Sequence, residues 1–209
     1  MLYRSSSIVP MPFHTTSLSQ TVAEQYNIPD LTRSPSTERD LFLEKPGKAV
    51  KMGESIESEG FIFTVNSYMT TKKGLLKPFQ YTDISRVKTD ENRNILNDYS
   101  YFMVNITVEN THQEAREKYL SHCSLYCIKN DNRISDEDGR ELFGYDGSEV
   151  ETQSFYAYPF APGEKRDFNL VYYIKDETIA DLKLATLIIN PGGAHPISPD
   201  VRFIDLIEE

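Results

Sequence analysis

The sequence has 209 residues, a formal net charge of −10 and a pI of about 4.9. That length allows one domain with its own core and an additional segment, and the negative charge argues against binding nucleic acid or anionic lipid. No apolar run reaches the roughly 18 residues of a membrane helix, and the absence of Trp argues against a sugar platform built from indole rings.

Residues 1–49 are polar and punctuated by proline, which predicts a linker or arm that holds short helices at most. The first 20 residues contain no basic start followed by an apolar stretch of signal-peptide length. Two alternatives follow from this. Either the protein is cytosolic, or the numbered chain starts after a removed signal peptide or at an introduced Met1.

From Val50 to residue 209 the sequence predicts one domain of short β-strands, beginning with 50–56 and 61–68. The clearest strand is 101–110, where apolar and polar residues alternate as in a sheet with one wet face. Its predicted core residues are Phe102, Val104, Ile106 and Val108, and its predicted solvent-facing residues are Asn105, Thr107 and Glu109.

Further strands are predicted at 119–128, 153–160, 168–174, 182–189 and 201–206, with one helical turn at 176–181. No long amphipathic helix separates them, which argues against parallel βαβ units. Short strands joined by turns predict an all-β fold, either a sandwich or a barrel.

The segment 70–98 is predicted to be a solvated loop or a functional insertion, and a short hairpin near 79–81 is an alternative within it. The segment is locally basic on an acidic protein. In the strand 153–160, Pro159 cannot donate a ladder hydrogen bond, which favours an edge position. We therefore predict a partner surface formed by Lys72, Lys73, Lys77, Tyr156 and Tyr158, with core packing as the alternative for the tyrosine rings.

The two cysteines, Cys123 and Cys127, share one face of a predicted strand and lie about 13 Å apart along it. A disulfide needs Cα atoms within about 7 Å, so we predict two small buried apolar side chains instead. No metal or other cofactor is predicted. The loop 134–145 lacks the Asp and Glu that an EF-hand requires at its first and last positions.

No HExxH, GxSxG, GxGxxG or GxxxxGK[ST] motif occurs, so the sequence predicts that the protein is not an enzyme. The alternative is a hydrolase with a loop-built site around His195 or His122. The triplet Asn105-Ile106-Thr107 matches a glycosylation acceptor, but it lies within a predicted strand rather than in a loop.

Three segments together resemble a known family. They are 51–55 leading into 60–65, 101–110 with Glu114 beyond it, and 160–168 preceded by the turn 138–140. This order resembles the immunoglobulin-like domains of unknown function in Gram-positive lipoproteins and secreted antigens. The resemblance covers about residues 50–207 and implies an immunoglobulin-like antiparallel β-sandwich at the cell surface, with residues 1–49 as its stalk. The lipid-bearing Cys of such lipoproteins does not occur near residue 1.

The resulting expectation is a non-enzymatic binding or scaffolding module of the bacterial cell envelope, located outside the cytoplasm. Its partner is expected to be a protein and not a nucleic acid, and membrane contact is expected only through a lipid anchor. A third hypothesis is a structural subunit that adds an edge strand to a neighbour.

Overall fold

The computed structural model describes residues 45, 48–74, 86–132, 144–146, 157–191 and 200–208. All of them belong to one compact unit, Glu38–Glu209. The strands are β1 (Lys48–Lys51), β2 (Ser55–Ser58), β3 (Phe61–Thr71), β4 (Tyr99–Asn110), β5 (Arg116–Tyr119), β6 (Cys123–Lys129), β7 (Gly144–Asp146), β8 (Ala157–Phe160), β9 (Lys165–Lys175), β10 (Leu182–Ile189) and β11 (Arg202–Glu208). The helical turns are the 3-10 turn Leu120–His122 and the helix α3 (Asp176–Ala180).

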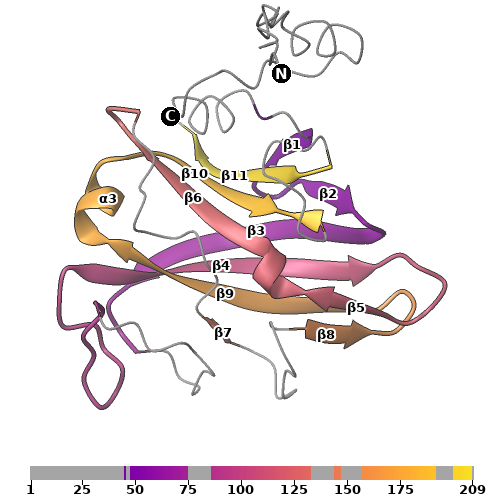
Figure 1. The fold of residues 1–209 in the computed structure, drawn as a ribbon, viewed down its shortest axis with the longest axis horizontal. Coiled ribbons are helices and arrows are strands. Elements are labelled where there is room, and N and C mark those ends of the chain that lie inside the picture. The colour runs from indigo at the N-terminus through magenta and orange to yellow at the C-terminus, as the bar shows by residue number, and fades with distance from the viewer. Residues whose placement is uncertain are drawn as a thin grey trace, which may run out of the picture. The chain divides into compact units, whose positions relative to one another are not determined.

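These strands form two packed sheets and a ribbon. One sheet has the order β1-β11-β10-β6, the other has the order β2-β3-β4-β9-β7, and β5 pairs with β8 in the ribbon. In Figure 1, β6 and β10 cross the long strands β3, β4 and β9 at a steep angle. The predicted all-β sandwich is confirmed. The named pairs are antiparallel except for β1 with β11, which run parallel.

The first predicted strand, 50–56, was wrong as a single element. The chain leaves β1 at Lys51 and enters β2 at Ser55, so it passes from the four-stranded to the five-stranded sheet. Gly53 has a φ of 89°, a left-handed conformation that glycine adopts without strain. The Met52 amide donates to the Asp205 carbonyl at 2.8 Å and the Gly53 amide to the Val65 carbonyl at 2.9 Å, which fastens the crossing to both sheets.

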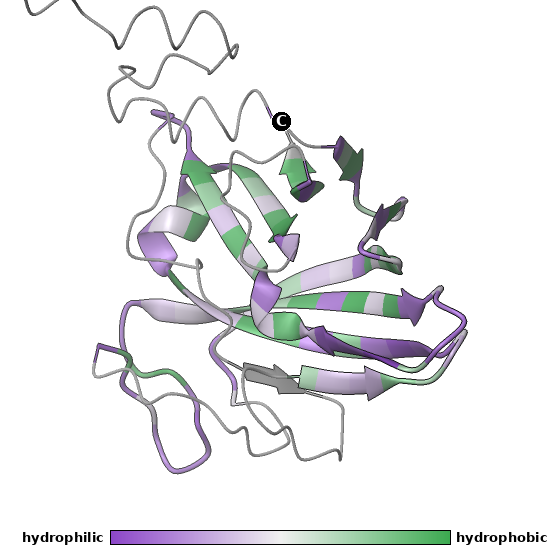
Figure 2. Ribbon diagram, turned by 45° about the vertical axis from the view of Figure 1, so that its right-hand side comes forward, coloured by the Kyte–Doolittle hydropathy of each residue, from purple (hydrophilic) through white to green (hydrophobic). Residues whose placement is uncertain are grey.

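The main core lies between the inner faces of the two sheets. The core residues predicted for 101–110 are confirmed, since all four are at most 1% exposed, but Thr107, which was predicted to face solvent, is only 8% exposed. Figure 2 shows the resulting succession of green and purple or pale segments along the strands of both sheets. The helical turn predicted at 176–181 is present as α3.

The two cysteines project into this core from β6. Neither forms a disulfide and both are completely buried, as predicted. Burial raises the pKa of Cys123 to about 12, against a smaller opposing effect of the Lys118 charge. The single strand predicted at 119–128 is divided: Tyr119 ends β5, the 3-10 turn Leu120–His122 buries Leu120 completely, and β6 begins at Cys123.

Candidate functional site

On the outer face of the five-stranded sheet, the polarity and charge of the side chains change along the strands. Side chains on alternate positions of β4 and β9 share this face because neighbours along a strand point to opposite sides. Its paired positions are, in order, Tyr101 with Tyr173, Met103 with Val171, Asn105 with Asn169, Thr107 with Asp167, and Glu109 with Lys165. The face is therefore apolar at one end, polar and largely uncharged in the middle, and charged at the other end.

The loop 86–98 covers the apolar end. Ile95 of this loop is 4% exposed and forms a buried cluster with residues of β4 and β9: Tyr99, Tyr101, Met103, Val171 and Tyr173. The Tyr101 hydroxyl donates to the Arg93 carbonyl at 2.8 Å, and a β-bridge joins Thr89 to Ile95. In its described part, the predicted insertion is thus a bridged turn with its own apolar anchor, whereas the suggested hairpin near 79–81 lies outside the described residues.

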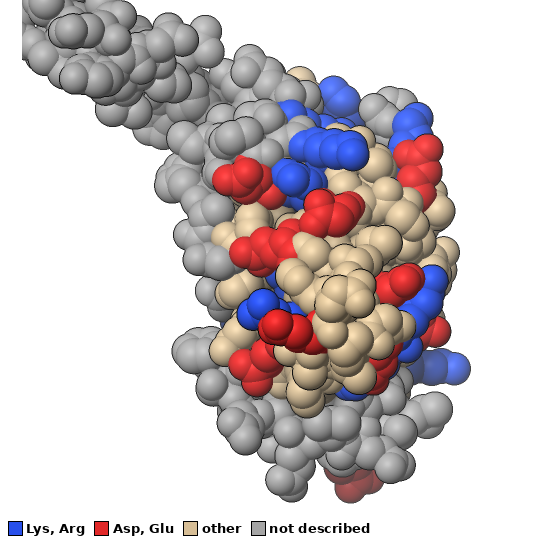
Figure 3. All heavy atoms as spheres, turned by 90° about the vertical axis from the view of Figure 1, so that its right-hand side faces the viewer, with Lys and Arg blue, Asp and Glu red and all other residues tan. Residues whose placement is uncertain are grey.

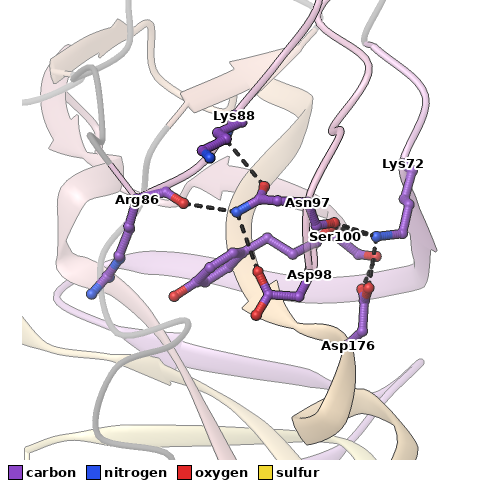
Figure 4. A network of polar contacts seen from close by, with 8 residues as sticks. Lys72, Arg86, Lys88, Asn97, Asp98, Ser100 and Asp176 are labelled. Atoms are coloured by element: carbon purple, nitrogen blue, oxygen red, sulfur yellow. Dashed lines mark hydrogen bonds and ion pairs between the residues drawn. The ribbon is translucent and has the colours of Figure 1, made fainter.

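Lys72 ties the start of this loop region to α3 (Figure 4). Its ammonium group donates to the Asn97 carbonyl at 2.6 Å, to the Tyr99 carbonyl at 3.1 Å and to Asp176 Oδ2 at 2.6 Å. Ser100 donates to the other oxygen of Asp176 at 2.7 Å. Partial burial alone would raise the pKa of Asp176, but the hydrogen bonds from Lys72 and Ser100 and the Lys72 charge outweigh it and lower the pKa.

Asn97 closes the same loop from within. Its side-chain amide donates to the Arg86 carbonyl at 2.8 Å, and its side-chain oxygen accepts the Lys88 amide at 3.1 Å. Figure 4 shows the Asn97 side chain bonded to both Arg86 and Lys88 of the segment 86–88. The loop is therefore held on the sheet both by apolar burial and by a connected set of hydrogen bonds.

Five side chains in the middle of the face form a hydrogen-bonded row across β3, β4 and β9, which we call the polar ladder: Asn66, Asn105, Thr107, Asp167 and Asn169. Asn66 is an extra residue in β3, since Val65 pairs with Ile106 and Ser67 with Asn105. Such a bulge redirects a side chain. The Asn66 amide here reaches two neighbours, Asn105 Oδ1 and Thr107 Oγ1, both at 2.8 Å.

The ladder continues from β4 to β9. The Asn105 amide donates to Asn169 Oδ1 at 2.7 Å, and the Thr107 hydroxyl donates to Asp167 Oδ1 at 2.6 Å. Thr107 is 8% exposed, while Asn66 and Asp167 are exposed and Asn105 and Asn169 are half-buried. The side chains thus fix one another, and all of them except Thr107 keep part of their surface exposed to solvent.

The glycosylation triplet lies within this ladder. Asn105 is in the central part of β4, which is paired with β3 on one side and β9 on the other. Its amide nitrogen and the Thr107 hydroxyl are both committed to cross-strand hydrogen bonds. Asn105 and Thr107 are therefore better explained as parts of the ladder than as an acceptor site.

The predicted partner surface is not assembled by the described residues. Lys72 is exposed but bound within the molecule, and Lys73 is exposed. For Tyr158 the core-packing alternative is confirmed and the partner-surface prediction is wrong: the residue is completely buried, and its ring centroid lies 5.1 Å from that of Phe168. The ribbon of β5 and β8 packs this side of β8 against the core. Lys77 and Tyr156 lie outside the described residues.

His122, one of the two histidines of the hydrolase alternative, lies at the end of the sandwich that carries the β5 and β8 ribbon. Burial and, to a smaller extent, the Lys118 charge lower its pKa. Its ring stacks on Tyr119 with centroids 5.4 Å apart. Among the described residues, no Ser or Asp forms a hydrogen bond with this ring. His195 lies outside them.

The most buried cation of this end is Lys118, which is 3% exposed. Its ammonium group binds Glu59 at 2.9 Å and lies 5.6 Å from the Phe61 ring centroid and 5.5 Å from that of Phe63. Figure 3 shows this end of the molecule, where acidic and basic side chains are interspersed. Lys118 therefore fastens the β2–β3 turn to β5. Within the described residues, no group of three His, Cys, Asp or Glu side chains is arranged to hold a metal ion.

Sequence reasoning missed three of the five ladder residues. Asn105 and Thr107 were expected on the wet face of their strand, and alternation in 165–175 would also have placed Asp167 and Asn169 on one face. Asn66 carried no such signal, because the bulge that redirects it depends on the pairing with β4.

Comparisons with known proteins concern the fold. No protein-family model matches the chain, and no curated protein does. An uncharacterized β-sandwich protein from Clostridium difficile is 16% identical over 77% of this chain and 95% of its own, with a TM-score of 0.44. The yjhA protein from Bacillus subtilis is 18% identical over 75% and 99%, with a TM-score of 0.46. A Bacillus subtilis protein described as a candidate lipoprotein is 14% identical over 74% and 38%, with a TM-score of 0.40.

None of the described helices is long and apolar enough to cross a membrane. The two packed sheets make the chain a β-sandwich, and its neighbours among solved structures include an uncharacterized β-sandwich protein from Clostridium difficile.

Proposed function

We propose that this protein is a non-enzymatic binding module of the bacterial cell envelope, located outside the cytoplasm, and that it binds through the polar ladder. The envelope location and the immunoglobulin-like class come from the sequence resemblance of residues 50–207 to domains of Gram-positive lipoproteins and secreted antigens. The binding role comes from the outer face of the sheet.

A single observation carries the binding role, namely the cross-strand hydrogen bonds of the polar ladder. Asn66, Thr107 and Asn105 already hold their neighbours at 2.6–2.8 Å, so the ladder needs little ordering when a ligand arrives. Binding costs less conformational entropy when the contacting side chains are fixed in advance. The three strands that carry the ladder also pair along most of their length, which makes the platform rigid.

The position of the ladder also favours recognition. The loop 86–98 borders it on the apolar side and the Glu109–Lys165 pair, with 3.3 Å between the charged atoms, borders it on the other side. A ligand on the ladder would therefore meet a raised edge at one end and charges at the other. Such a site is defined by a rigid scaffold and an adjacent loop, the usual arrangement for binding in β-sandwich domains.

In the test, the full chain and its single variants are each immobilised on a resin. The amount of solubilised envelope material from a Gram-positive bacterium that each resin retains is then compared. Thr107→Val and Asp167→Ala remove ladder hydrogen bonds, and we expect each to reduce retention at least tenfold. Lys73→Ala is the matched control, because this exposed side chain lies on the loop region and outside the ladder; its retention should equal that of the unmodified chain.

Circular dichroism and thermal unfolding establish that each variant is folded before the comparison. Unchanged retention in both folded ladder variants would overturn the proposal. A loss confined to Lys73→Ala would overturn it as well, because the binding surface would then be the basic loop. Turnover of an added ester or peptide substrate by the unmodified chain would contradict the non-enzymatic role.

A further inference from the structure

We infer that the polar ladder takes a neutral, hydroxyl-rich glycan. This inference rests on the proposed function, since it names the ligand class of the same surface. It follows from three properties of the ladder: which hydrogen-bonding atoms remain open, how little charge it carries, and which apolar side chain lies beside it.

The open atoms include donors and acceptors in alternation. Among the described residues, Asn66 uses both amide hydrogens and leaves its side-chain oxygen open, whereas Asn169 uses its oxygen and leaves its amide open. Asp167 uses Oδ1 and leaves Oδ2 open. A hydroxyl group both donates and accepts, so a ligand with several neighbouring hydroxyls satisfies all three residues, as a ligand with acceptors alone cannot.

The charge of the ladder disfavours anionic ligands, although the cation Lys165 borders it beside Glu109. Asp167 is the single ionisable side chain among the five ladder residues, and the whole chain carries a formal net charge of −10. A phosphate- or sulfate-rich polymer would be repelled by both. The Asp167 carboxylate lies beside Thr107 and next to Asn169 along β9. It suits neutral hydroxyls, because a charged acceptor forms stronger hydrogen bonds than a neutral one without requiring a charged ligand.

An apolar shelf adjoins the ladder on the side of the loop. Met69 of β3 pairs with Met103 of β4 on the same outer face and is 52% exposed. A flexible thioether side chain adapts to irregular apolar surfaces, and the C–H face of a sugar ring is such a surface. Met69 therefore supplies the apolar contact that an indole ring would otherwise give in this chain without Trp.

The dimensions also fit linked sugar rings. Adjacent strands lie about 4.8 Å apart and alternate residues along a strand about 7 Å apart. The ladder crosses three strands and occupies two successive outward positions of β9, Asp167 and Asn169. Its open atoms thus cover an area comparable to that of one or two linked sugar rings, which corresponds to a short stretch of an oligosaccharide chain.

The experiment titrates the ¹⁵N-labelled full chain with two neutral oligosaccharides, chitotetraose and maltotetraose, and with dextran sulfate as an anionic probe. We expect saturable shifts of the Asn66, Asn105 and Asn169 side-chain amide signals with at least one neutral oligosaccharide, and no such shifts with dextran sulfate. The two neutral probes separate recognition of acetamido groups from recognition of hydroxyls alone.

Two variants test the chemistry of the site. Asp167→Asn keeps the shape but weakens the acceptor, and we expect its Kd for the neutral oligosaccharide to rise about tenfold, the loss of one charge-assisted hydrogen bond. Met69→Ala should raise Kd about threefold through the lost apolar contact. Leu96→Ala is the control, because Leu96 is also exposed, at 66%, but lies on the covering loop.

The outcomes separate the inference from the proposed function. Ladder shifts caused by envelope protein but by neither oligosaccharide would overturn the glycan inference and leave the binding role in place. Saturable ladder shifts with dextran sulfate that grow in Asp167→Lys would also overturn the glycan inference, because the ladder would then bind anions. If neither the oligosaccharides nor the envelope material shifts the ladder amide signals, both the glycan inference and the proposed binding role are overturned.

Discussion

The two ends of one sheet face behave differently although the same strands carry them. At the apolar end, Tyr101 and Tyr173 point outward and are nevertheless only 3% and 5% exposed, because the loop 86–98 lies on them. A few residues further along β4, Asn105 also points outward, but it is only half-buried. Its side-chain amide donates a hydrogen bond to Asn169 of the neighbouring strand β9. Outward direction alone therefore does not decide burial.

The difference teaches how a sheet face can combine stability with recognition. The covered end contributes apolar burial, which stabilises by roughly 25 cal/mol per Å². The polar ladder contributes cross-strand hydrogen bonds that exchange with water and give little net stability. Substitutions should therefore separate the two regions by the size of their effect on the free energy of unfolding.

The largest effect is expected on the inner face, which sets the scale for the comparison. Phe102 is completely buried and its ring stacks on Tyr68 with centroids 5.4 Å apart. Phe102→Ala should lower the free energy of unfolding by about 3–5 kcal/mol through lost burial and a residual cavity. Urea denaturation followed by circular dichroism measures this change, and a loss under 1 kcal/mol would place Phe102 outside the core.

The covered end should show the next largest effect. Ile95→Ala should lower the free energy of unfolding by about 2–3 kcal/mol, because Ile95 packs the loop against the buried cluster of tyrosine and methionine side chains. Leu96→Ala is its matched control, since the neighbouring Leu96 is 66% exposed and such substitutions stay within about 0.5 kcal/mol. Equal losses in the two variants would mean that the loop does not cover the sheet as described.

The polar ladder should be less sensitive. Thr107→Val keeps the shape but removes the bond to Asp167 and the acceptor for Asn66. Both partners are exposed and can form hydrogen bonds with water instead. We therefore expect the free energy of unfolding, measured by urea denaturation, to fall by about 0.5–1.5 kcal/mol. A loss as large as that of Phe102→Ala would show that the ladder is part of the structural core, which would remove the contrast between the two regions.

The smallest effect concerns the ion pair that holds the loop. The pKa of Asp176 lies below its unfolded value, so its stabilising contribution is present above about pH 4 and is lost as the pH falls through the lower folded value. Because Lys72 and Asp176 are 47% and 41% exposed, solvent screening keeps the contribution below about 1 kcal/mol.

Thermal unfolding of the unmodified chain and of Asp176→Asn should therefore converge between pH 6 and pH 3. In Lys72→Met the additional Asp176→Asn substitution should have a smaller effect at pH 6, since the charged partner is gone. A difference between the unmodified chain and Asp176→Asn that grows toward acid would have the wrong sign for this ion pair.

Local sequence patterns predicted the parts of the fold that depend on alternation. The period of two in 101–110 predicted the buried residues of β4 correctly, because every second side chain of a paired strand faces the same layer. The same pattern predicted the burial of Cys123 and Cys127. These features depend on a few neighbouring residues and on the tendency of apolar side chains to leave water.

Alternation did not predict which outward side chains would be covered. Tyr158 was expected on an exposed edge, but pairing of β8 with β5 buries it against Phe168. Lys72 was expected to meet a partner, but its ammonium group binds the Asn97 carbonyl and Asp176. Both corrections depend on segments far away in the sequence, which no local pattern contains.

The sequence by itself determined most of the long strands, their inner faces and the burial of both cysteines, because these follow from the order of apolar and polar residues. The tertiary structure alone decided the crossing between sheets at 52–54, the bulge that aims Asn66, and the loop that covers one end of the outer face. Each of these depends on pairing between distant strands, and the polar ladder exists only where that pairing brings β3, β4 and β9 into register.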